Sequence, residues 1–184
     1  MTSAAQPGDR PGRPSDAGEQ LCADDDRFER VPADAAFAHR VFDELAEDGA
    51  VMLYAAAKGR WAKAHTLSYD AAHKSVEALL LTRGWRVTGR GGGHQAIVAF
   101  VDAWLSDAPP PGPRIARKFA AAVVARHAEE YPHPRDPART NRELRELTLD
   151  NVRLMNVARQ ALDLGPRDDL VPTEANLTDF TGPQ

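Results

Sequence analysis

Apolar residues recur at helical spacing in five segments of this chain, and this pattern limits the fold more than any other feature. Residues three, four or seven positions apart share one side of an α-helix, so each segment can bury one face. No segment alternates between apolar and polar residues over a useful length, as a half-buried strand would. The positions are Phe37, Val41, Leu45, Met52 and Ala56; Tyr69, Ala72, Val76, Leu79 and Leu80; Ile97, Val98, Val101, Trp104 and Leu105; Ile115, Phe119 and Val123; and Leu144, Leu147, Asn151, Leu154, Ala158 and Leu162. The chain is therefore predicted to be all-α, an up-and-down helical bundle of about five helices.

Turn and capping residues support these boundaries. Gly84 follows the second segment, where a left-handed residue ends many helices. Prolines 109–111 stop the third segment, and Pro113 is well placed to open the fourth. Thr140, with Glu143 three residues later, forms a capping box that begins the fifth helix.

The two ends of the chain have little apolar surface to bury. Residues 1–27 are rich in Pro, Gly, Ala and Asp, a composition typical of a disordered arm. Residues 165–184 indicate a flexible tail, although Leu170, Val171 and Phe180 are able to dock weakly. The helical domain is expected to span residues 28–164.

Several features predict a cytoplasmic protein. The one cysteine, Cys22, excludes an internal disulfide and suits a reducing compartment. The first residues have no apolar run long enough for a signal peptide, and no run approaches the ~18 apolar residues of a membrane span. The net charge is −4, but residues 114–145 are rich in arginine. This basic region is either a solvated helix face or a binding surface.

Two other motifs are weak. GRGGGH, at 89–94, lacks the lysine and hydroxyl residue that end a phosphate-binding loop, and it follows a helix rather than a strand. It predicts a flexible turn, with His94 as a packing or capping residue. No histidine has the spacing or the neighbouring cysteines of a zinc site, so we expect no metal and no cofactor. The histidines considered as ligands are His65, His73, His127 and His133.

Residues 126–133 read RHAEEYPH and contain the groups that metal-free RNA cleavage needs. Arg126 and His133 are seven positions apart, which is about two helical turns. Arginine can bind two phosphate oxygens, and histidine titrates near neutral pH and suits proton transfer. Alternatively, Arg126 pairs with Glu130 four residues on, and the histidines are ordinary surface residues.

The order of the segments resembles the HEPN superfamily (higher eukaryotes and prokaryotes nucleotide-binding domains). YDAAHKSVEALLLTRGWRVTG, at 69–89, is similar to a HEPN helix, and GGHQAIVAFV, at 92–101, fits the family's third segment. ARHAEEYPH, at 125–133, resembles the family's motif of arginine, four to six residues and histidine. A long helix containing NVRLMNVARQAL follows, and the resemblance covers residues 33–164.

The resemblance implies a metal-independent endoribonuclease, or the toxin of a toxin–antitoxin or phage-defence pair. Arg126 would hold the scissile phosphate and His133 would be the general acid or base. Tyr131 and His127 would position or assist, and Arg135 and Arg139 would contact the RNA. His127 departs from the polar residue, commonly Asn, that follows the arginine in many active members.

Pairing of two chains is a further expectation, because a homodimer brings two copies of the motif together and doubles the available groups. The expected partners are RNA and an antitoxin or nucleotidyltransferase protein. The alternative function is a non-catalytic HEPN adaptor that binds a partner protein or a nucleotide.

Overall fold

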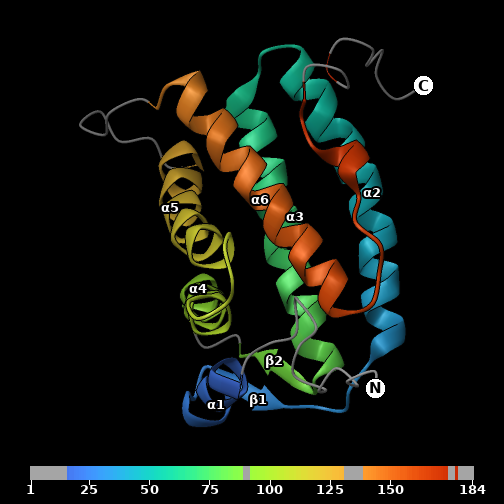
Figure 1. The fold of residues 1–184 in the computed structure, drawn as a ribbon, viewed down its shortest axis with the longest axis vertical. Coiled ribbons are helices and arrows are strands. Elements are labelled where there is room, and N and C mark those ends of the chain that lie inside the picture. Colours follow the sequence, from blue (N-terminus) through green and yellow to red (C-terminus); the bar gives the residue numbers. More distant parts are fainter. Residues whose placement is uncertain (1–15, 89–91, 131–138, 174–176, 178–184) are drawn as a thin grey trace, which may run out of the picture.

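The structure is a computed structural model that describes residues 16–88, 92–130, 139–173 and 177. These residues form six α-helices, a two-stranded antiparallel sheet and one 3-10 turn (Figure 1). The elements are α1 (Asp16–Asp24), β1 (Phe28–Arg30), α2 (Ala35–Ala57), α3 (Trp61–Thr82), β2 (Trp85–Val87), α4 (Gly93–Leu105), α5 (Gly112–Glu130), α6 (Asn141–Ala161) and η1 (Asp168–Leu170). The prediction of an all-α helical bundle is confirmed.

Helix α3 is the centre of the bundle, with α2 and α6 lying alongside it (Figure 1). Small side chains on α3 are buried and allow its neighbours to approach closely. They are Ala64, Ala71, Ala72, Ser75 and Ala78. Ala72 belongs to the helical stripe that the sequence shows.

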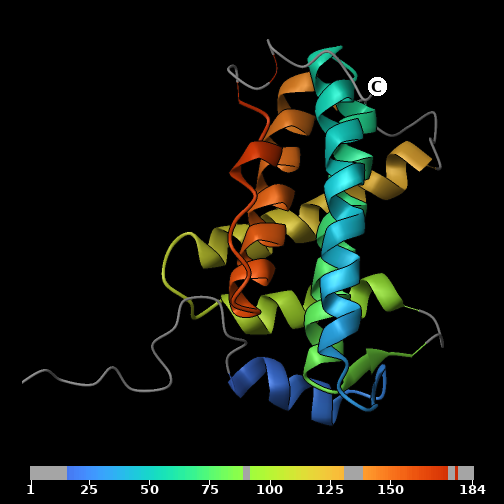
Figure 2. The same ribbon diagram turned by 90° about the vertical axis from the view of Figure 1, so that its right-hand side faces the viewer.

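The helices do not follow a strict up-and-down order. α2 and α3 are antiparallel, but α6 runs in the same direction as α3 (Figure 1). The Arg145 guanidinium lies 5.7 Å from the ring centroid of Trp61, and further along both helices Asn151 donates a 3.1 Å hydrogen bond to Ser68. The parallel pair is possible because α4 and α5 run across the long helices and carry the chain back between them (Figure 2).

Local signals fix the helix ends as the sequence predicted. Gly84 has a positive φ of 74°, and its amide donates to Leu81 at the end of α3. At α6 the Thr140 side chain accepts from the Glu143 amide, and the Glu143 carboxylate accepts from the Thr140 amide. The capping box is therefore present.

The structure corrects the expectation of a disordered arm for residues 16–27. They contain α1, which packs against α4: a Cβ atom on Gly18 would lie 3.2 Å from the Phe100 ring. Cys22 is buried there as well. The apolar partners of α1 come from α4, where Phe100 and Trp104 lie beside Gly18. Residues 1–15 lie outside the described residues.

The chain after α6 turns back over α2 in part. Leu170 is only 4% exposed and covers Gly49, where a Cβ atom would lie 2.7 Å from the Leu170 side chain. The expectation that Leu170 docks on the bundle is confirmed. Phe180 lies outside the described residues.

Candidate functional site

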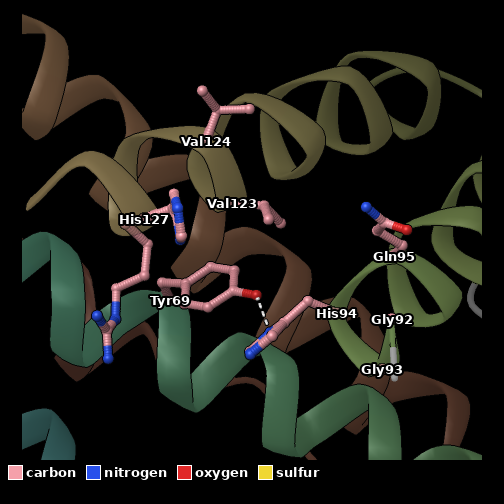
Figure 3. A pocket seen from close by; sticks show the side chains of 9 residues that line it. Tyr69, Gly92, Gly93, His94, Gln95, Val123, Val124 and His127 are labelled. Atoms are coloured by element: carbon pink, nitrogen blue, oxygen red, sulfur yellow. Dashed lines mark hydrogen bonds between the residues drawn. The ribbon is translucent and has the colours of Figure 1, made fainter. Parts of the chain in front are cut away.

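A cavity of about 440 Å³ opens between α3, α4 and α5 (Figure 3). Its lining combines ionisable side chains with glycines and valines. The lining residues are Tyr69, Gly92, Gly93, His94, Gln95, Val123, Val124, Arg126 and His127. A cavity of this size is within the range of small-molecule and cofactor sites.

Tyr69 forms the floor of the cavity, where it extends from α3 toward the start of α4 (Figure 3). Its ring stacks on Phe119 of α5 at 5.6 Å between centroids, which anchors the tyrosine in the core. Its hydroxyl oxygen lies 2.7 Å from Nδ1 of His94. Burial is the main reason why the pKa of Tyr69 is raised above its usual value, so the phenol keeps its proton at neutral pH.

His94 lies in the first turn of α4, at an exposed position. Gly92 precedes the helix with a φ of 75°, a left-handed conformation that glycine adopts without strain. Of the glycine-rich segment, Gly92 and Gly93 are described; they lead into α4, whose first turn places His94 beside Tyr69. Of the two roles expected for His94, packing or capping, the structure shows packing: its ring lies against those of Tyr69 and His73. Gly92 is the N-cap, and it makes no side-chain capping bond.

A second histidine, His73, lies one turn after Tyr69 on α3. Its ring centroid is 4.6 Å from that of His94, and its Nδ1 is 3.6 Å from a carboxylate oxygen of Glu77. Burial and the nearby His73 lower the pKa of His94, because both disfavour a positive charge on the ring. The His94 ring is therefore held in its neutral form at neutral pH.

Arg126 and His127 line the cavity from α5, as two of the residues that the sequence singled out. The Arg126 side chain is 22% exposed, and its Nε lies 3.5 Å from Oδ1 of Asp70 on α3. This ion pair spans two helices. The Glu130 side chain lies outside the described residues, so the local pair with Arg126 stays a prediction. His127 is exposed at the rim. We refer to Tyr69, His73, His94, Arg126 and His127 as the pocket cluster.

Only one of the other predicted site residues, Arg139, is among the described residues. Tyr131, His133 and Arg135 fall outside the described residues. Arg139 is described, and it is exposed just before α6 without lining the cavity. That Arg126 and His133 lie close together in the fold therefore stays a prediction.

Tyr69, His73 and His94 are the site residues that the sequence did not reveal. Tyr69 looked like a core residue of a helical stripe, and it is indeed buried. Tyr69 and His73 are four positions apart, so a shared helix face was visible. The contact with His94, twenty-five residues away, depends on the turn between α3 and α4 and had no local signal.

The lining offers one guanidinium, two imidazoles with access to the cavity, and apolar walls. This combination can bind an oxyanion and hold a flat or apolar group beside it. Within the described residues, no three His, Cys, Asp or Glu side chains are grouped as metal ligands.

Comparisons with protein-family models, with curated proteins and with solved structures found no match to this chain. In the part of the chain that the structure describes, no helix is both long and apolar enough to cross a membrane.

Proposed function

We propose that this chain is a HEPN-type helical domain that binds RNA in the cavity between α3, α4 and α5 and cleaves it without a metal ion. The observation that supports the proposal is the convergence of Arg126, His127 and His94 on one cavity. His94 is in the first turn of α4, and Arg126 and His127 are near the end of α5, the next helix. An arginine and histidines around one cavity are suited to phosphate binding and proton transfer.

In the proposed reaction the 2′-oxygen of RNA attacks the adjacent phosphorus, and the bond from phosphorus to the 5′-oxygen breaks. A base removes the 2′-hydroxyl proton, and an acid protonates the leaving 5′-oxygen. Arg126 binds the non-bridging oxygens and stabilises their developing charge. His133 is the proposed acid or base, and His127 assists by contacting the phosphate.

The products follow from this chemistry. One fragment ends in a 2′,3′-cyclic phosphate and the other begins with a free 5′-hydroxyl. No water or metal enters the first step. Detection of these two ends distinguishes the proposed reaction from a metal-dependent hydrolysis.

A non-catalytic adaptor that binds a nucleotide is the second candidate. It is favoured by the ion pair between Arg126 and Asp70, because a guanidinium that already has a carboxylate partner carries less free charge for a transition state. The apolar walls also suit a single base. Val123 and Val124 both line the cavity, and Val124 is 62% exposed.

The two candidates are separated by incubating the purified protein with RNA in excess EDTA. The nuclease proposal expects chelator-resistant cleavage that Arg126→Ala reduces by about a hundredfold or more. Arg142→Ala is the matched control, because Arg142 is an exposed arginine on α6 that pairs with Glu146 on the same helix. Wild-type protein that binds nucleotides but cleaves no RNA would exclude the nuclease and favour the adaptor.

Homodimerisation also belongs to the proposal. The HEPN resemblance implies it, although one chain already provides more groups than the arginine and histidine of the motif. Light scattering on purified protein tests this, and a strict monomer would contradict it. In the cell, the proposal expects the protein to be cytoplasmic and to bind an antitoxin or a nucleotidyltransferase. Co-purification with the product of a neighbouring gene tests this binding.

A further inference from the structure

We propose that His94 contacts the substrate in this cavity as a hydrogen-bond donor through Nε2. Tyr69 is the positioning residue that keeps the His94 ring neutral, with its proton on Nε2. The inference rests on the proposed function, because the acceptor that it requires is a phosphate oxygen of the bound RNA. It adds a residue outside the arginine–histidine motif. It also assigns that residue a role other than proton abstraction.

The direction of the Tyr69–His94 hydrogen bond determines the form of the imidazole. Tyr69 is 1% exposed, and the described residues provide no partner for its hydroxyl other than Nδ1 of His94. If Nδ1 carried a proton and donated, the phenol hydrogen would be buried without an acceptor, which is costly. Tyr69 therefore donates to Nδ1, and the single proton of the neutral ring is on Nε2.

The charges around His94 support the same form. His73 and Glu77 face it from α3, together with Asp70, and Arg126 faces it from α5. Burial has the largest influence on the pKa of His94, and it acts with His73 and Arg126 to lower that pKa. The carboxylates act in the opposite direction and are outweighed. A positive ring would also need a proton on Nδ1, which would break the bond that Tyr69 donates.

The His94 side chain is accessible from the cavity. It is exposed and lines the cavity, while Nδ1 is occupied by the Tyr69 hydroxyl (Figure 3). Nε2 is separated from Nδ1 by one ring carbon, so its N–H is on the part of the ring that the Tyr69 hydroxyl does not occupy. His73 packs against the ring at 4.6 Å and limits its rotation.

The consequence is a division of roles within the cavity. A ring that carries its proton on Nε2 cannot remove a proton with that atom. It can donate to a non-bridging phosphate oxygen, as Arg126 does, and so stabilise negative charge that develops there. Proton transfer then belongs to His133 of the motif, while His127 contacts the phosphate.

Nuclear magnetic resonance of the imidazole nitrogens tests the positioning role of Tyr69. Wild-type protein should show His94 protonated at Nε2 and titrating below the ordinary histidine pKa of 6.5. Tyr69→Phe removes a bond that stabilises the neutral form, so the pKa of His94 should rise and its proton should become shared between the two nitrogens. A proton on Nδ1 in the wild type, or an unchanged spectrum in Tyr69→Phe, would overturn the inference.

Two substitutions test the contact with the substrate. The amide nitrogen of glutamine occupies the position of Nε2, so His94→Gln retains the proposed donor. His94→Asn places its amide near Nδ1 and retains only the group that faces Tyr69. The probe is an RNA oligonucleotide with 2′-O-methyl groups, which binds but cannot be cleaved, and its affinity is measured by fluorescence anisotropy.

We expect His94→Gln to bind this probe nearly as well as wild type and His94→Asn to bind about tenfold more weakly, the effect of one lost hydrogen bond to a charged group. Equal affinities of both variants, whether weakened or not, would overturn the inference. If the wild type still cleaves RNA in that case, the proposed function stands without His94. A wild type that neither binds the probe nor cleaves RNA overturns both.

Discussion

Two groups of polar side chains on α3 differ in what covers them. The first is a sealed group formed by His65 and Ser68 with Asn151 of α6, and we call it the inner polar cluster; all three residues are buried. The second is the pocket cluster, which begins at Tyr69 and opens to the cavity. Ser68 and Tyr69 are consecutive residues, but one bonds to α6 and the other to α4.

The difference shows that burial of a polar residue does not by itself indicate function. Consecutive residues lie about 100° apart on a helix, so α3 can direct one polar group into each of two interfaces. In the inner polar cluster the groups are enclosed by protein, and Asn151 donates to Ser68 at 3.1 Å. In the pocket cluster the groups border a cavity that a ligand can enter. We therefore expect substitutions in the first to affect folding and substitutions in the second to affect RNA.

The largest effect should separate two histidines. His65 is 0% exposed, and His65→Ala should lower the free energy of unfolding by about 3 kcal/mol, because it leaves a cavity in a packed interior. His94→Ala should lower it by less, about 1 kcal/mol, since His94 is exposed and the main loss is its hydrogen bond with Tyr69. Urea unfolding measures both values. Equal losses would remove the distinction between the two clusters.

His127→Ala should reduce RNA cleavage by about tenfold, the contribution of one hydrogen bond to a charged phosphate (~1.4 kcal/mol). Its folding stability should be nearly unchanged because the side chain is exposed. Single-turnover cleavage rates, compared with those of His133→Ala, provide the measurement. A loss as large as that of His133→Ala would assign the proton transfer to His127.

Ser68→Ala should lower the free energy of unfolding by about 1 kcal/mol, because the buried amide of Asn151 loses its acceptor. RNA binding should not change. Ser106→Ala is the control: its hydroxyl is exposed at the end of α4 and bonds only within that turn. If Ser68→Ala weakened RNA binding while Ser106→Ala did not, the inner polar cluster would belong to the site.

The smallest effect concerns pH. The pKa of His94 is lower in the folded chain than its ordinary value of 6.5, so the unfolded chain binds more protons in the interval between the two values. Stability should therefore decrease slightly as the pH falls through 6.5 and then level off below the folded pKa. Thermal unfolding of wild type and His94→Gln across this range detects the difference. A wild-type curve with the opposite slope relative to the variant would contradict the lowered pKa.

The sequence revealed features that depend on neighbouring residues. Helical stripes, the glycine at 84 and the capping box at Thr140 each act over a few positions, and each was predicted correctly. The order in α1 was missed because its apolar partner is α4, some eighty residues later. β1 and β2 have three residues each, too few to show an alternating pattern.

The candidate site was only partly predictable for the same reason. Arg126 and His127 were noticed because they are adjacent to other polar residues in the sequence. Tyr69 and His94 meet only after α3 and α4 pack together, and Tyr69 has the apolar stripe position of an ordinary core residue. A tyrosine in such a position gives no sign of the hydroxyl partner that the fold provides.

The central claim is that RNA binds at the pocket cluster and not elsewhere on the bundle. The most direct measurement is a titration of isotope-labelled protein with the 2′-O-methyl oligonucleotide, followed through the ring signals of the histidines. The account predicts that His94 and His127 shift and that His65, sealed on the same helix as Tyr69, does not. Shifts that occur at His65 or at residues remote from the cavity, with His94 and His127 unchanged, would contradict it.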